Sequence, residues 1–240
     1  MAAEAADTPP TPPRLHLLGE LTWRDVDSSE APLLAVPIGS CEQHGPHLPL
    51  DTDTRIAVAL AEALATSFEP VDIVVAPALT ITSSGEHAGF AGTLSIGAAV
   101  TEQLVVELVR SADWCAGVVL VNGHGGNALP VRRAVSTLHG EGRQVLAWWP
   151  HVTGSDAHAG HTETSLLLAI APHLVRRGRA EVGRREHITD LIDELRAGGV
   201  RAISANGVLG NPLDATAAHG RALLTRLTID LIAAVDEWRT

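Results

Sequence analysis

The chain has 240 residues, of which 45% are hydrophobic and 19% charged, with a formal net charge of -11 at pH 7 and a sequence pI near 5.5. This composition excludes a disordered chain, and the apolar runs are too short and too interrupted for a membrane-spanning helix. The negative charge excludes non-specific binding to nucleic acid or to an anionic membrane, because both need a basic surface. We therefore expect a globular protein without nucleic-acid or membrane partners.

The two cysteines, Cys41 and Cys115, provide no disulfide framework, and the first residues lack the basic and apolar regions of a secretory signal. We expect a cytoplasmic protein in which Cys41 is a small packed side chain. Residues 1–13 are rich in Ala, Pro and Thr and predict a flexible tail. Residues 14–240 are long enough for one domain with a full core.

The first element with a clear pattern is the continuous apolar run Leu33–Ile38, which predicts a strand buried on both faces. It leads into a loop, rich in glycine and proline, that contains Glu42, His44 and Asp53. Their oxygen and nitrogen donors suit zinc, iron or manganese, and the stiff loop can hold them in place before a metal binds. The alternative is a polar turn with solvated side chains. The density of donors favours a metal site.

A helix with an apolar face is predicted from Asp53 to about Thr66, followed by a break at Glu69-Pro70 and a second strand at Ile73–Val75. The next stretch, Thr80–Gly97, is too long for an ordinary connection and contains Glu86 and His87. Loops of this length are often functional, so we interpret it as a wall or lid of the site. The alternative is a solvated loop.

An amphipathic helix is predicted over Ala98–Trp114 and a third buried strand over Gly117–Val121. This strand ends in a second motif of Asn, Gly and His at residues 122–127, with His124 between glycines. Donors at the carboxyl end of a strand are typical of sites in open α/β sheets. A simple turn and a phosphate-binding glycine loop remain alternatives for this motif alone. Beside the first motif, a metal ligand at His124 is favoured.

A helix over Val131–Leu138 and a fourth strand over Gln144–Trp149 precede a third donor cluster at residues 156–165. Glu163 lies at the start of an apolar helix, where the helix dipole favours a carboxylate. Three distant clusters, each at a strand-to-helix junction, converge only if a sheet aligns those ends. The prediction is an α/β fold: one three-layer α/β/α domain around a mostly parallel sheet.

The rest of the chain has no donor-rich pattern. We expect a charged surface segment at Arg176–Arg185, a short helix at Ile188–Leu195 and a strand-like or loop segment at Gly198–Gly210. The last helix should cover the sheet or an oligomer interface with one apolar face, formed by Leu224, Leu227, Leu231, Val235 and Trp238. Surface or core packing is expected for five histidines, namely His16, His139, His173, His187 and His219.

With these motifs assembled, the chain resembles the creatininase family of metal-dependent amidohydrolases from about Leu33 onward, above all in residues 42–49 with Asp53. The resemblance implies that Asp53 bridges two metal ions, with Glu42 and His124 on one ion and His44 on the other. Creatininase has a glutamate two residues after the motif histidine, where this chain has Gly126. By the same resemblance, Glu163 replaces that glutamate.

The resemblance is closest to family members that act on a peptide, in residues 48–57, 84–87, 90–97, 158–165 and 207–210. It implies cleavage of a modified precursor peptide to release its C-terminal Val-Tyr-derived unit, two divalent ions (iron or zinc, with manganese possible) and a homo-oligomer, expected to be a hexamer. His158 matches the proton-transfer histidine, and Glu86 and His87 would shape the groove or support the ligands. Alternatives are a cyclic amide or formamide hydrolase of the family and a non-catalytic metal-binding scaffold subunit.

Overall fold

The computed structural model describes residues 16–27, 31–67 and 73–240. The tail predicted at residues 1–13 and the break predicted at Glu69-Pro70 lie outside these ranges. None of the described helices combines the length and hydropathy that a membrane crossing requires.

A five-stranded sheet forms the centre of the described structure, and every strand pairing in it is parallel. The order is β1 (His16–Leu17), β3 (Ile73–Val75), β2 (Leu33–Ile38), β4 (Gly117–Asn122) and β5 (Val145–Trp148). All residues of β2 and β4 are buried, because helices cover both faces of the sheet and strands flank both edges of this pair. The predicted α/β class with a parallel sheet is confirmed.

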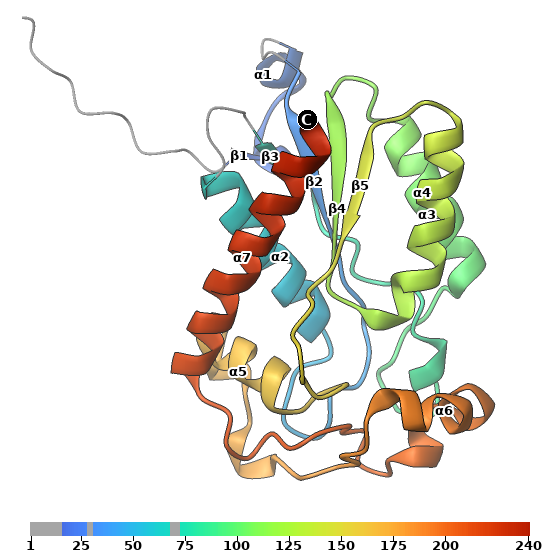
Figure 1. Cartoon of the computed structure of the whole chain (residues 1–240), viewed down its shortest axis with the longest axis vertical. Coiled ribbons are helices and arrows are strands. Elements are labelled where there is room, and N and C mark those ends of the chain that lie inside the picture. The colour runs from blue at the N-terminus through green and yellow to red at the C-terminus, as the bar shows by residue number, and fades with distance from the viewer. Residues whose placement is uncertain (1–15, 28–30, 68–72) are drawn as a thin grey trace, which may run out of the picture.

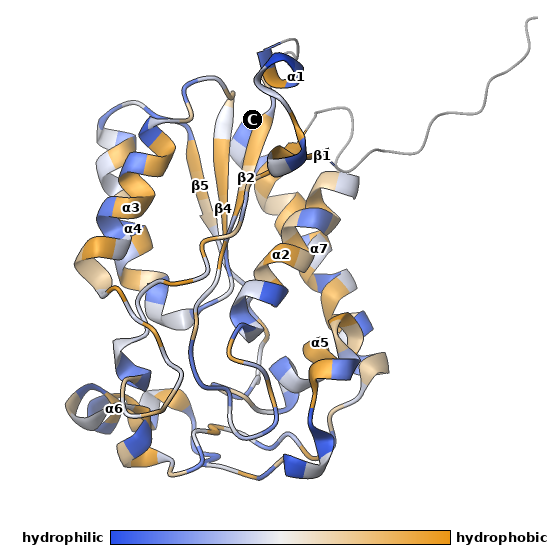
Figure 2. Ribbon diagram, turned by 180° about the vertical axis from the view of Figure 1, so that it is seen from behind, coloured by the Kyte–Doolittle hydropathy of each residue, from blue (hydrophilic) through white to orange (hydrophobic). Residues whose placement is uncertain are grey.

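Helices cover the two faces of the sheet, so the structure has three layers (Figure 1). On one side lie α2 (Thr52–Ser67), α5 (His161–Ile170) and α7 (Ala217–Arg239), and on the other lie α3 (Ala98–Arg110) and α4 (Ala128–Gly140). Alternate residues of the strands point into the two apolar clusters between these layers. Figure 2 shows the resulting pattern, with β2, β4 and β5 mostly hydrophobic.

Several predicted boundaries differ from the structure. The helix predicted over Ala98–Trp114 ends at Arg110, because residues 111–116 form turns that lead into β4. The strand-like or loop prediction at Gly198–Gly210 is wrong for its first part, because α6 (Ile188–Ile203) continues through it. Gly199, with φ of 70°, kinks α6 where a side chain would meet the backbone oxygen of Glu86 at 2.7 Å.

Short elements near the start of the described chain escaped the sequence pattern, namely β1 and α1 (Trp23–Asp27). The last helix covers the sheet, since Leu227, Leu231 and Val235 are fully buried in the core beneath it.

The site lies at the carboxyl ends of the two central strands. Ile38, the last residue of β2, is in register with Asn122, the last residue of β4. The loops that follow therefore begin side by side, and they bring the first and second sequence motifs together.

Candidate metal centre

The loop after β2 is fixed against the start of α2 by close packing. A side chain at Gly39 would overlap the backbone of Thr54, so this turn requires glycine. The hydroxyl of Ser40 donates a 2.7 Å hydrogen bond to Asp53 Oδ2. Asp53 lies in the first turn of α2 and is only 1% exposed. The sequence motif thus folds back on itself and buries a carboxylate.

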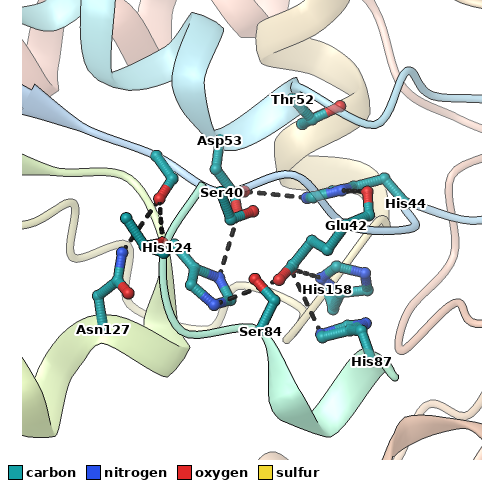
Figure 3. Close-up of polar contacts among 12 residues, drawn as sticks. Ser40, Glu42, His44, Thr52, Asp53, Ser84, His87, His124, Asn127 and His158 are labelled. Atoms are coloured by element: carbon teal, nitrogen blue, oxygen red, sulfur yellow. Dashed lines mark hydrogen bonds and ion pairs between the residues drawn. The ribbon is translucent and has the colours of Figure 1, made fainter. Parts of the chain in front are cut away.

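The two oxygens of Asp53 face two different histidines (Figure 3). Oδ1 lies 2.9 Å from His44 Nε2, and Oδ2 lies 3.1 Å from His124 Nδ1. The other ring nitrogens face backbone oxygens, His44 Nδ1 that of Glu42 at 3.2 Å and His124 Nε2 that of Ser83 at 2.8 Å. These backbone contacts leave the nitrogens beside Asp53 available to a metal ion.

Charge in this cluster is balanced by protons when no metal is present. Burial would lower the pKa of His44, but the charge of Asp53 and its hydrogen bond outweigh burial and raise that pKa to about 10. Burial likewise opposes ionisation of Asp53, yet the two histidines hold its pKa well below the usual value. A cation between Asp53 and each histidine would replace a proton there.

The Glu42 carboxylate is fully buried, and neither of its oxygens has a hydrogen-bond partner among the described residues. Three ring nitrogens surround it, at 3.2 Å (His124 Nε2), 3.3 Å (His87 Nε2) and 3.8 Å (His158 Nδ1). Burial raises the pKa of Glu42 to about 7. An orphaned buried carboxylate is costly, and coordination of a cation would satisfy it. This observation fits the metal site that the donor set predicts.

Glu163 approaches from the start of α5. Its Oε2 accepts a 2.6 Å hydrogen bond from the backbone N–H of Ala159 and lies 3.8 Å from His44 Nε2. Ala159 has φ of 52°, a left-handed conformation that is strained for alanine, and it is fully buried. The strained turn therefore presents Glu163 to the same side of the centre as His44.

Four groups of potential ligating atoms lie among the described residues. Glu42 joins His44 and His158 in one group and Glu86 and His87 in another, and the remaining two groups share Asp53. Glu42, Asp53 and His124 form one group, and His44, Asp53 and Glu163 form the other, with the ligand atoms of each group within 4.8 Å of one another. The structure brings together all five residues that the sequence suggested as ligands. Cys41 is half-buried, belongs to neither group, and has its thiol 3.6 Å from the backbone oxygen of Gly92.

His158 lies beside this centre between two other imidazoles, with ring centroids 4.3 Å from His44 and 4.5 Å from His87. Its Nε2 lies 2.8 Å from the backbone oxygen and 3.0 Å from the side-chain nitrogen of Gln43, and its Nδ1 lies 3.8 Å from Glu42 Oε1. Burial, and then the positive charge of His44, lower the pKa of His158 well below its usual value. A neutral imidazole beside the centre results.

Glu86 and His87 belong to the short 3-10 helix η2 (Gly85–His87) in the long loop after β3, and both side chains reach the centre. The loop therefore lies along one side of the centre. Asn127 ties the loop to the other motifs, since its side chain accepts from the Ser83 N–H at 3.2 Å and donates to the Gly39 oxygen at 3.1 Å.

Two buried residues of the first motif, Gln43 and His47, were not identified from the sequence as part of the site. The Gln43 side-chain N–H groups contact His87 Nδ1 at 2.9 Å and the Gly207 oxygen at 3.0 Å. His47 is fully buried, and its Nε2 lies 2.9 Å from the hydroxyl of Thr164 on α5. The only indication of their role in the sequence is that they stand between the candidate ligands of the first motif. A cavity of about 240 Å³ adjoins His124 and Glu163, and both apolar residues (Trp149, Val152) and polar ones (Asp156, Thr162) line it.

The chain is similar to known proteins over most of its length. The family model described as "Creatininase: Creatinine amidohydrolase" matches residues 19–235. The mycofactocin precursor peptide peptidase of Mycobacterium tuberculosis (strain ATCC 25618 / H37Rv) is 45% identical over 230 residues, which cover 92% of this chain and 91% of the relative. That of Mycolicibacterium smegmatis is 46% identical over 227 residues, with the same coverage of both chains.

A solved structure of a mutant creatininase, described as of Zn-Zn type, superposes with a TM-score of 0.78 at 22% identity and covers 93% of this chain and 98% of its own. At this identity the likeness shows the fold alone. The family model spans nearly the whole described structure, and the relatives cover most of the sequence. The chain belongs to the creatininase family.

Proposed function

We propose that this protein is a metal-dependent peptidase that cleaves the modified mycofactocin precursor peptide and releases its C-terminal Val-Tyr-derived unit. The observation that carries the proposal is the pair of ligand groups that share Asp53, in a chain that is 45% identical to a mycofactocin precursor peptide peptidase. Hydrolysis of an amide bond is the reaction that such a centre supports.

Five residues would hold two divalent ions. Asp53 would bridge them, with Glu42 and His124 on one ion, and His44 and Glu163 on the other, as the two groups of ligating atoms suggest. Carboxylate and imidazole donors suit zinc or iron, and manganese is also compatible. Ions held in this way supply Lewis acidity, since they polarise a carbonyl group and make water more acidic.

His158 would move the proton during hydrolysis. Its N–H toward the Gln43 oxygen fixes the ring, and its free Nδ1 faces the centre, so it can take a proton from the attacking water. The same nitrogen can then deliver the proton to the leaving amine. His87 would support this arrangement, because its Nδ1 lies 2.9 Å from the Gln43 side-chain nitrogen and its Nε2 lies 3.3 Å from Glu42 Oε1.

The cavity beside His124 and Glu163 would receive an apolar part of the substrate. Trp149, Val152 and Leu166 line one part of it, where an apolar or aromatic side chain would pack, and Asp156 and Thr162 line another. The C-terminal Val-Tyr unit of the precursor has this character. We expect the protein to act as a homo-oligomer, a hexamer by the family resemblance, which light scattering after size-exclusion chromatography would measure.

The decisive experiment is mass spectrometry of the modified precursor peptide after incubation with metal-loaded protein, with Glu163→Ala as the control. Release of the modified C-terminal dipeptide by the wild type, and its loss in the control, would support both the substrate and the role of Glu163. A peptide that stays intact with fully metal-loaded wild-type protein would refute the peptidase proposal. Assays with cyclic amides and formamides would then follow.

A further inference from the structure

The glycine at position 126 is required by its surroundings and not by its backbone conformation. Gly126 lies in η3 (Gly125–Asn127), just after His124, and its φ is outside the left-handed region. A Cβ built there would overlap Glu86 Oε1 and His124 Nε2, and would lie 2.7 Å from the Ser83 oxygen. At the neighbouring Gly125, a Cβ would have no atom within 4 Å. The space beside Gly126 is therefore filled by the side chain of Glu86.

Glu86 reaches this space from a segment about 40 positions away in the chain, and its contact there is with a metal-ligand candidate. Its Oε1 lies 3.4 Å from His124 Nε2, and the side chain is only 26% exposed. The carboxylate therefore lies against the imidazole of His124.

The two nitrogens of His124 have separate partners. Nδ1 faces Asp53 Oδ2, whereas Nε2 faces the Ser83 oxygen at 2.8 Å, Glu42 Oε2 at 3.2 Å and Glu86 Oε1 at 3.4 Å. Histidines that bind a metal usually donate their other N–H to a carboxylate or a backbone oxygen, which fixes the ring and increases its basicity. Glu86 and Ser83 stand in that position relative to Nε2.

We propose that Glu86 is a positioning residue for His124, and that glycine at position 126 keeps the space that this carboxylate needs. The inference rests on the metal centre of the proposed function and adds a residue and a steric requirement to it. Glu86 acts through the imidazole and need not contact the substrate. Removal of Glu86 should lower the affinity for the ion on the His124 side and leave the affinity for the ion on the His44 side unchanged.

The first test is Glu86→Gln, which keeps the shape of the side chain and removes its charge. The matched control is Glu102→Gln, because Glu102 is similarly exposed at 31% but faces Arg133 on the outer helices, with an Oε2 to Nη1 distance of 3.9 Å. Titration of metal-free protein with Zn²⁺ against a chromophoric chelator gives the affinity for each ion. Absorption spectra of the Co²⁺-loaded protein report the ligand geometry.

We expect Glu86→Gln to lower the affinity for one of the two ions by roughly 10- to 100-fold and to alter the Co²⁺ spectrum. Glu102→Gln should match the wild type in both measurements. Both affinities within twofold of the wild type, with an unchanged spectrum, would overturn the proposal. Neither readout requires the peptide. An intact precursor peptide would therefore refute the proposed function alone, and normal metal binding by Glu86→Gln would refute this inference alone.

The second test uses the steric requirement. Gly126→Ala should weaken binding of the same ion, because its methyl group would overlap both Glu86 Oε1 and His124 Nε2, whereas Gly125→Ala should bind both ions normally. Removal of the Glu86 side chain relieves the first of these overlaps. In a Glu86→Ala background, Gly126→Ala should cause a smaller additional loss than it causes in the wild type. Fully additive effects on metal affinity would show that the two positions act independently, and would overturn the steric part of the proposal.

Discussion

Replacement of Glu42 by glutamine should affect the metal-free and metal-loaded proteins in opposite directions. The Glu42 carboxylate is fully buried, and neither of its oxygens has a hydrogen-bond partner among the described residues. Glu42→Gln keeps the shape and removes the charge. Without metal, the variant should therefore gain stability relative to the wild type as the pH rises. With metal, the variant should be stabilised less than the wild type.

The magnitude follows from the pKa of Glu42, which burial raises from 4.5 to about 7. A carboxyl group with a raised pKa in the folded state destabilises that state as the pH rises from the unfolded pKa to the folded one. The difference between these two pKa values corresponds to about 3 kcal/mol in full, and most of it develops between pH 5 and pH 8. Glutamine has no such dependence. Its buried amide adds a pH-independent cost of about 1–3 kcal/mol.

Thermal unfolding of metal-free wild type and Glu42→Gln at pH 5 and pH 8 measures this difference directly. The Tm of the variant relative to the wild type should rise by about 5 to 10 °C between the two pH values. Added Zn²⁺ should then raise the Tm of the wild type far more than that of the variant. Glu237→Gln, on the exposed face of α7, is the control. An equal loss of Tm at both pH values would refute the reasoning, because it would mean that the buried charge is already compensated.

Three further outcomes are expected at the centre. Asp53→Asn should reduce the bound metal from two ions to none, whereas Glu163→Gln should lose only the ion on the His44 side; elemental analysis gives both numbers, and equal losses would contradict a bridging Asp53. His158→Ala should keep its metal content and lose about 10²- to 10⁴-fold in peptide turnover, measured by mass spectrometry, so full activity would exclude it from proton transfer. Metal binding at pH 7 should release protons, because the pKa of His44 is raised to about 10 in the ion-free protein and a cation must displace its proton. The affinity for metal should therefore fall as the pH falls, by about tenfold per pH unit for each displaced proton. Calorimetry in buffers of different ionisation enthalpy measures the number of protons released, and a binding enthalpy independent of the buffer would contradict the prediction.

Local patterns were sufficient for the main elements of the sheet and for the ligand candidates. The apolar runs at Leu33–Ile38 and Gly117–Val121 predicted buried strands, because a strand covered on both faces cannot carry polar side chains. Glycine turns directly after these runs, with carboxylates and histidines behind them, identified the ends where a site forms. These features depend on residues that are close together in the sequence, so they could be predicted without the structure.

Contacts between distant segments decided the rest. Gln43 meets Gly207 across 164 positions, and His47 meets Thr164 across 117, so no local pattern indicates their roles. The kink at Gly199 and the strain at Ala159 are likewise set by what packs against them, and not by propensity.

The sequence by itself determined the fold class, the parallel strands and the chemical character of the centre, because these follow from hydrophobic periodicity and from donor type. Only the tertiary structure decided which nitrogen of each histidine faces Asp53, that Glu42 has no hydrogen-bond partner among the described residues, and that Glu86 fills the space beside Gly126. These arrangements depend on the packing of β2, β4, α2 and α5 against one another. Ring orientation and shared space are properties of that packing, and they arise only when the whole chain is folded.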